Sequence, residues 1–312
     1  MTTGKKSLRA GSAVMLVSAA LIWGVAFVAQ TTGMDHVGPW TLSAVRMLLA
    51  GLALIPAFLL FDRLGLSPKG VSRKETWRAG LILGCVLFVA ANLQQVGLMT
   101  TSVAKSGFIT SLYIVLVPLF GVLVQRRSVR PVIWLSVALA VGGLYLLATG
   151  TDGFSVTPGD LLTLACAGGF AAHILTAGYF ANRADVLRMS CIQFFTASAL
   201  SAVVMLFTEE PKLTDIAAAW LPITYAGVLS GGAAYTLQML GQRNIEPAAA
   251  SLLLSPEAVF AALAGWLLLG QTLTGRELIG CALVFAAVLL SQLPEKTNLP
   301  GEAPKTERST ES

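Results

Sequence analysis

The sequence predicts an all-α membrane protein with ten transmembrane helices, arranged as two inverted five-helix repeats. Of its 312 residues, 55% are hydrophobic and only 12% are charged, and the mean hydropathy is +0.75. Soluble domains carry about a quarter charged residues, so this chain has too few to cover a water-facing surface. Two further observations support the same class: ten apolar runs long enough to cross a bilayer, and an internal repeat.

The apolar runs form two groups of five, separated by short turn-like segments. The first group is expected at 12–32, 40–61, 77–98, 103–124 and 132–149. The second group is expected at 159–182, 189–207, 217–240, 247–269 and 277–293. A helix of about 20 residues crosses the hydrocarbon core of a bilayer, so each run can form one span. No segment between the runs is long enough for a folded extramembrane domain.

We therefore divide the chain into a first repeat at 10–150, a second repeat at 157–293 and a disordered tail at 294–312. The first apolar run follows Lys5, Lys6 and Arg9, which is also typical of a signal peptide. This run continues for about 20 residues and has a counterpart in the second half of the chain. We expect it to be retained as the first span.

The distribution of Lys and Arg predicts the orientation, because cytoplasmic loops are enriched in both. With the N-terminus inside, seventeen of the 21 basic residues lie on the inner side, and Arg46 lies within a span. Only Lys105, Lys212 and Arg276 lie on the outer side. The prediction is a cell-membrane protein with both termini cytoplasmic. This asymmetry also explains the net charge of +5, so we expect no nucleic-acid partner.

The internal repeat relates the two halves by two shifts. A shift of 144 residues superimposes three residues of the third span on identical residues of the eighth: Ala90, Gln94 and Gly97 on Ala234, Gln238 and Gly241. In the first two spans a shift of 147 sets Trp23 on Phe170 and Arg46 on Gln193. Five helices per copy is an odd number, so the second copy enters the membrane from the opposite side. Inverted repeats of this kind hold a substrate site near the midplane and work by alternating access.

Two stretches resemble a known family. The stretch Thr101–Pro118 (TSVAKSGFITSLYIVLVP) is similar to the fourth helix, and Ser255–Gly270 (SPEAVFAALAGWLLLG) to the ninth, of EamA-type members of the drug/metabolite transporter superfamily. The pair Trp23-Gly24 and Arg46 are also similar to the family pattern, and the resemblance covers about 10–293. Gln271 departs from it, since the family commonly has an acidic residue there. The resemblance implies a ten-helix carrier, often an exporter of amino acids, related metabolites or drugs.

Glu257 is the sharpest candidate for a site residue, because it alone of the 16 acidic residues lies near the middle of a span. It stands ten residues beyond Pro247, or roughly 15 Å deep at 1.5 Å per residue. Ionisable groups at such depth usually face a cavity or pair with another helix. Glu257 is therefore either a cavity residue that carries a coupled proton or a structural carboxyl.

Arg46 and Lys105 are cations near the expected outer mouth. Each could attract a carboxylate of the substrate or pair with Glu257, and each could instead anchor its helix at the membrane interface. Neither residue determines the charge of the substrate.

Neutral polar and aromatic residues within the spans complete the predicted cavity. The amide and phenol groups at helical spacing are Asn92, Gln94, Gln95, Tyr113, Gln193, Tyr235 and Gln238. Hydrogen bonding between helices without ligand contact is the alternative for each. His173 could relay protons or be a hydrogen-bonded core histidine. Trp23 and Phe170 could stack against the substrate or fill the core.

The sequence lacks the patterns of an enzyme. Cys85, Cys166, Cys191 and Cys281 lie singly in expected spans, and no P-loop pattern occurs. We expect no cofactor and no metal; the expected partners are a small-molecule substrate and the lipid bilayer.

A monomer is expected, with glycine pairs such as Gly80 and Gly84 serving packing within the chain. A channel or a non-transporting receptor is the alternative, and saturable counterflow would distinguish a carrier from a channel.

Overall fold

The computed structural model describes residues 3–68, 70–124, 126, 128–148, 157–270 and 274–293. Within these residues every regular element is helical. The predicted disordered tail at 294–312, the segment that joins the two predicted repeats, and Gln271 lie outside the described residues.

The described residues of the first half form six helices. These are α1 (Thr3–Met34), α2 (Pro39–Arg63), α3 (Arg73–Gly97), α4 (Val103–Ser111), α5 (Tyr113–Leu123) and α6 (Pro131–Ala148). Pro39 begins α2, where its missing N–H costs nothing, and the Ser72 hydroxyl accepts a hydrogen bond from the Glu75 N–H to cap α3. The expected span 103–124 is thus divided between α4 and α5.

The second half begins with α7 (Pro158–Phe180) and α8 (Val186–Thr208). The short helices α9 (Leu213–Ala218) and α10 (Trp220–Thr224) follow, then a π-helical segment, η1 (Tyr225–Ala234), and α11 (Tyr235–Gly241). The last described helices are α12 (Pro247–Leu254), α13 (Glu257–Leu269) and α14 (Gly275–Ser291). Segments of π-helix occur often at functional sites, and η1 directly precedes Tyr235.

Seven helices among the described residues are long and apolar enough to cross a membrane. They are Ser7–Met34, Pro39–Arg63, Arg73–Gly97, Val103–Leu123, Pro158–Phe180, Val186–Thr208 and Pro247–Leu268, and Pro131–Leu147 is a shorter apolar helix. The protein is therefore a multi-pass membrane protein. The expected span 217–240 is divided among α9, α10, η1 and α11, and the expected span 277–293 falls in α14, which has only 17 residues. The number of ten transmembrane spans therefore stays a prediction.

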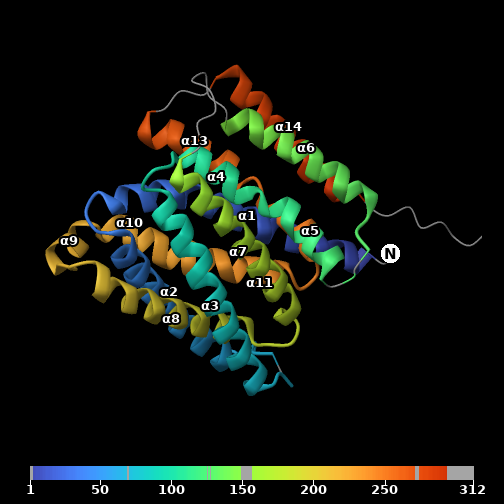
Figure 1. Ribbon diagram of the computed structural model, residues 1–312. Coiled ribbons are helices and arrows are strands. Elements are labelled where there is room, and N and C mark those ends of the chain that lie inside the picture. Colours follow the sequence, from blue (N-terminus) through green and yellow to red (C-terminus); the bar gives the residue numbers. More distant parts are fainter. Residues whose placement is uncertain are drawn as a thin grey trace, which may run out of the picture.

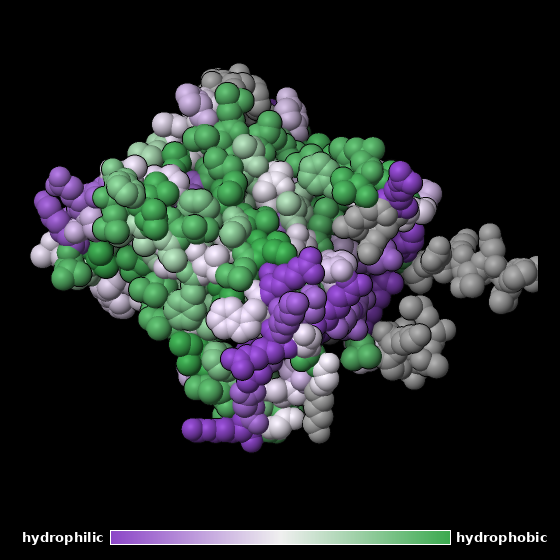
Figure 2. Space-filling view, turned by 60° about the horizontal axis from the view of Figure 1, so that its bottom comes forward, coloured by the Kyte–Doolittle hydropathy of each residue, from purple (hydrophilic) through white to green (hydrophobic). Residues whose placement is uncertain are grey.

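Hydrophobic side chains cover much of the outside of the helix bundle. Figure 2 shows a broad hydrophobic surface, with hydrophilic residues gathered mainly in a band on one side and in a smaller group at the opposite edge. Large apolar side chains are widely exposed, for example Phe207 at 86% and Leu289 at 72%. A lipid environment, in which such exposure is favourable, accounts for this surface.

The helices pack in pairs that join the two halves of the chain. α6 and α14 lie side by side along one edge (Figure 1), and α2 packs along α8. α3 packs on both α7 and α8, while α1 packs on α13, η1 and α11. A Cβ atom at Gly80 or Gly84 would collide with α8, and one at Gly227 or Gly231 with α2. These glycine pairs therefore serve close packing within the chain.

Acidic side chains fasten both ends of the α2·α8 pair. At one end Glu209 accepts hydrogen bonds from the backbone N–H groups of Trp40 (3.0 Å) and Thr41 (2.8 Å), which caps α2. At the other end Arg188 forms an ion pair with Asp62 at 2.5 Å. Asp62 and Glu209 are 147 residues apart, the shift found for the first two spans.

Two helix breaks occupy equivalent places in the two halves. α4 ends at Ser111 and α5 begins at Tyr113; α12 ends at Leu254 and α13 begins at Glu257. Tyr113 and Glu257 are 144 residues apart, the shift found for the later spans. Discontinuous helices form substrate sites in transporters.

Candidate functional site

A cavity in the centre of the bundle collects most of the site residues predicted from the sequence. Nine of the twelve predicted residues line it: Trp23, Arg46, Gln94, Tyr113, Phe170, His173, Tyr235, Gln238 and Glu257. They come from α1, α2, α3, α5, α7, α11 and α13, so both halves of the chain contribute. The cavity thus lies where the two halves meet.

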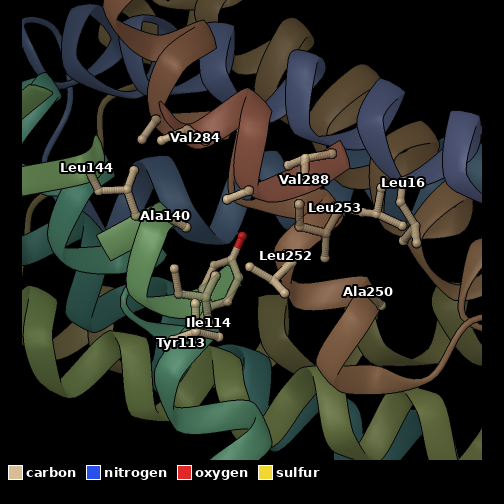
Figure 3. Close-up of a cluster of buried hydrophobic side chains, with 14 of the residues drawn as sticks. Leu16, Tyr113, Ile114, Ala140, Leu144, Ala250, Leu252, Leu253, Val284 and Val288 are labelled. Atoms are coloured by element: carbon tan, nitrogen blue, oxygen red, sulfur yellow. The ribbon is translucent and has the colours of Figure 1, made fainter. Parts of the chain in front are cut away.

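The charged, amide, hydroxyl and imidazole side chains that line the cavity are each at most 9% exposed. On the side where α1 begins, a hydrophobic cluster that includes Leu16, Ile114, Leu252 and Leu253 closes the bundle. Figure 3 shows Tyr113 of α5 within this cluster. At the other end of α1, Phe27, Leu98, Val103 and Ala261 form a smaller cluster.

Glu257 begins α13 at one of the helix breaks and is 4% exposed. The Ser111 hydroxyl, at the end of α4, donates a hydrogen bond to its Oε1 at 3.3 Å. The two helix breaks therefore meet at this carboxyl. The first turn of α13 directs its helix dipole toward Glu257, which favours a negative charge there.

Arg46 lines the same cavity and is 8% exposed, so it does not reach the membrane surface. Its Nε is buried without a hydrogen-bond partner. Among the residues that the structure describes, no carboxylate lies within 4.0 Å of its guanidinium, and the predicted alternative of a pair with Glu257 is not formed. A buried charge without a partner is costly, so this guanidinium is suited to an anionic group that enters the cavity.

Aromatic rings surround Tyr235 on one wall of the cavity. Its ring centroid lies 4.7 Å from that of Trp23, 5.5 Å from that of His173 and 5.4 Å from that of Phe194, each edge-to-face. The Trp23 indole N–H donates to the Ser230 carbonyl in η1 at 3.2 Å. These contacts fix the rings, which leaves a rigid apolar surface for part of a ligand.

Neutral polar groups line the rest of the cavity. Gln94 donates to the Thr110 hydroxyl at 3.1 Å, while Oε1 of Gln238 and of Gln30 are buried without a partner. Sequence reasoning did not select Gln30 or Ser230. Gln30 had a usable signal, because it follows Trp23 by seven residues and so lies on the same face of α1.

Three predicted residues lie off the cavity. Asn92 donates to the Phe88 carbonyl at 2.8 Å and to the Ser201 hydroxyl at 2.9 Å, so it joins α3 to α8. Gln193 lies behind the wall, with its Oε1 3.1 Å from Nε2 of His173. Gln95 is fully buried, and both of its polar side-chain atoms lack a partner.

Lys105 pairs with Asp160 at 2.5 Å and joins the start of α4 to the start of α7. Asp160 also accepts hydrogen bonds from the Thr101 hydroxyl at 2.9 Å and the Thr157 backbone N–H at 2.7 Å. The two side chains are only 16% and 6% exposed. The pair therefore holds one end of the bundle closed beyond the cavity.

Breaking this ion pair is expected to destabilise the protein by about 3 kcal/mol, because the remaining charge stays buried. Asp160→Asn, Lys105→Met and the double variant, unfolded reversibly in mixed micelles, give the coupling energy between the two side chains. We expect at least about 1 kcal/mol of coupling. The exposed pair of Arg78 and Glu75, 3.7 Å apart, serves as a control and should give below about 0.5 kcal/mol. Equal coupling in the two pairs would refute the role of the buried one.

Nothing in the cavity suggests covalent or metal chemistry. The described residues contain no group of three or more His, Cys, Asp or Glu side chains placed to hold a metal ion. The four cysteines are free thiols, and Cys191 donates to the Gly51 carbonyl at 3.4 Å. What the cavity can offer a ligand is one carboxyl, one guanidinium, several amides and a wall of aromatic rings.

Comparison with known proteins identifies the family. The model of the EamA-like transporter family matches residues 11–149 and again residues 157–293. The chain belongs to the EamA-like transporter family. It is therefore a transporter of the drug/metabolite superfamily type, which acts on a small molecule in a membrane setting and is not an enzyme.

Other EamA-like proteins align over most of the chain. A transporter of Archaeoglobus fulgidus, named only as uncharacterized, is 31% identical over 93% of this chain and 88% of its own length. The uncharacterized inner membrane transporter YedA of Escherichia coli is 25% identical over 88% of each chain. The threonine/homoserine exporter RhtA of Salmonella typhimurium is 32% identical over 53% of this chain and 56% of its own.

A crystal structure supports the same fold. Its chain is 20% identical to this one and superimposes with a TM-score of 0.75, covering 91% of this chain and 96% of that chain. At this identity the likeness concerns the fold alone.

Proposed function

We propose that the protein is a secondary transporter that moves amino acids and related small metabolites out of the cell across the cell membrane by alternating access. The observation that carries the proposal is that Arg46 and Glu257 line one buried cavity without pairing with each other. A zwitterion supplies the missing partners, with its carboxylate at Arg46 and its ammonium at Glu257. The similarity to a threonine/homoserine exporter supports this substrate class and direction.

The architecture proposed is ten spans in two inverted repeats, 10–150 and 157–293, with both termini cytoplasmic. Three packing contacts between the halves support it, because each has an equivalent when the halves are exchanged. α3 with α7 corresponds to α11 with α1, α3 with α8 corresponds to η1 with α2, and α5 with α7 corresponds to α13 with α1. The α2·α8 pair and the α6·α14 pair each join equivalent helices, so exchanging the halves leaves both pairs unchanged. An exchange symmetry of this kind lets one repeat take the place of the other, which is the basis of alternating access.

Glu257 couples the substrate to a proton in this proposal. Its carboxyl holds either the ammonium group of the substrate or a proton, and these exclude each other. Release of the substrate outside lets a proton bind, and return of the protonated carrier delivers the proton inside. The monomeric carrier thus needs no ion or nucleotide other than the proton.

The test is exchange of radiolabelled threonine, homoserine and uncharged analogues in proteoliposomes. We expect saturable, trans-stimulated exchange of zwitterions, and Arg46→Gln should raise the half-saturating concentration at least about tenfold, since a charged hydrogen bond contributes about 1.5 to 3 kcal/mol. Arg78→Gln, an exposed change on α3, is the control. Flux that does not saturate would indicate a channel. Exchange of solutes without a carboxylate at the same rate would refute the role of Arg46.

A further inference from the structure

A second, larger hollow lies outside the central cavity, where the end of α2 faces the start of α3. Its apolar wall consists of Ile55, Phe58, Trp77, Ile192 and Phe195. Its polar end consists of Arg73, Thr76, Asp185 and Arg188. The predicted orientation places this hollow, the α2–α3 groove, at the cytoplasmic surface of the membrane.

The packing of the helices explains why the groove exists. α2 and α3 follow each other in the chain, yet α2 packs mainly on α8, α3 packs on both α7 and α8, and the contact between α2 and α3 is small. Residues of α8 form the floor of the groove between them. Arg188 to Phe195 on α8 spans seven residues, so the floor extends about 10 Å from the polar end into the apolar wall.

The equivalent place in the other half is partly covered by protein. The shift of 147 sets Ile192 on Val45 and Thr196 on Leu49, which lie in one hydrophobic cluster with Ile216 of α9 and Ile223 of α10, whereas Leu48, the counterpart of Phe195, is 44% exposed. The α2–α3 connection contributes Pro68 and Val71 to the groove but leaves Leu64 and Leu66 exposed at 60% and 61%. The apolar wall of the α2–α3 groove thus borders an unfilled hollow.

Of the two arginines at the polar end of the groove, Arg188 has carboxylate partners and Arg73 does not. Arg188 is paired with Asp62 at 2.5 Å and with Asp185 at 3.5 Å. Arg73 is exposed, and no carboxylate in the described part of the chain lies within 4.0 Å of its guanidinium. The groove therefore offers one available positive charge directly above an apolar slot.

We propose that the α2–α3 groove binds an anionic phospholipid of the cytoplasmic leaflet, with the phosphate at Arg73 and one acyl chain along Phe58, Ile192 and Phe195. An amphiphile with a negative head and an apolar tail matches both ends of the groove, and the surrounding leaflet supplies it. Basic pockets between helices on the cytoplasmic side have this preference for anionic lipids. The proposal relies on the predicted orientation but not on any transported substrate.

Trp77 lies in the groove and reports on its occupant. Bromine on a lipid chain quenches tryptophan within contact distance, and the difference between wild type and Trp77→Phe isolates this residue. We expect brominated phosphatidylglycerol to compete for the site about fivefold better than brominated phosphatidylcholine, since one basic residue near anionic lipid contributes about 1 kcal/mol. Arg73→Gln should reduce the preference to about one.

Trp134 is the matched control. It lies three residues into α6, near the same predicted surface, is 38% exposed compared with 50% for Trp77, and does not line the groove. Because Arg130 lies one helical turn before Trp134, any lipid preference at Trp134 should be unchanged by Arg73→Gln. A preference at Trp77 that survives Arg73→Gln, or an equal loss of preference at both tryptophans, would overturn the proposal. Absence of quenching at Trp77 by either lipid would also overturn it and would indicate cover by protein, such as a second copy of the chain. None of these readouts requires transport, so failure here leaves the proposed function untouched.

Discussion

Replacing Glu257 with glutamine is expected to reduce transport by about 100-fold or more. Glutamine keeps the shape of the side chain and can still accept the hydrogen bond from Ser111, so the fold should persist. It carries no charge and no exchangeable proton, so the substrate loses a charged hydrogen bond of about 3 kcal/mol, which corresponds to roughly 100-fold. The measurement is uptake into inverted vesicles driven by a pH gradient, together with exchange at equilibrium.

Glu210→Gln is the control, because Glu210 is exposed and does not line the cavity. The two assays separate the two roles of Glu257. If Glu257→Gln abolished gradient-driven uptake but left exchange intact, Glu257 would carry the proton without binding the substrate. Unchanged transport with an unchanged pH dependence would remove Glu257 from the mechanism altogether.

Adding one methyl group at Gly24 is expected to destabilise the protein by about 1 to 3 kcal/mol. A Cβ atom there would lie 2.8 Å from the Ala261 backbone N and 2.8 Å from the Glu257 carbonyl O. Backbone atoms cannot move aside as a flexible side chain can, so α1 must shift away from α13 next to the cavity. Gly24→Ala should lower the folded fraction in a reversible unfolding titration and reduce exchange in parallel.

Gly168→Ala provides the opposite expectation. Gly168 also lies inside a helix, but nothing is within 4 Å of its hypothetical Cβ. Alanine favours the helix over glycine by up to about 1 kcal/mol, so this variant should be as stable as wild type or more stable. If the two substitutions changed stability equally, the close contact of α1 with α13 would not be what requires glycine at position 24.

The fold class and most of the cavity could be predicted from the sequence for one physical reason. A polar side chain within an apolar span is too costly to face lipid, so Gln94, Gln238 and Glu257 were expected to face the interior. The sequence left Arg46 open between the cavity and the membrane interface. The family assignment from Trp23-Gly24 and the two long motifs is confirmed by the family match across both halves.

The remaining details depend on how helices pack, which periodicity does not encode. The repeat sets Gln193 in the second half at the position of Arg46 in the first half. Arg46 lines the cavity, whereas Gln193 lies behind the cavity wall, next to His173. Lys105 was predicted as a cation at the outer mouth, but its partner Asp160 lies 55 residues away and no local pattern joins them. Pro256 hints at the break before α13, whereas nothing about Leu112 announces the equivalent break before α5.

The helix break at Glu257 has an energetic consequence for the proposed exchange. The equivalent break in the first half presents Tyr113, so among the described residues the cavity has one carboxyl, not two. A single carboxyl binds one proton at a time, and the stoichiometry is then one proton for each zwitterion exported. One charge moving through 100 mV releases about 2.3 kcal/mol, which sustains an outward concentration ratio of roughly fiftyfold. Such a carrier can relieve a metabolite excess steadily but cannot empty the cell of it.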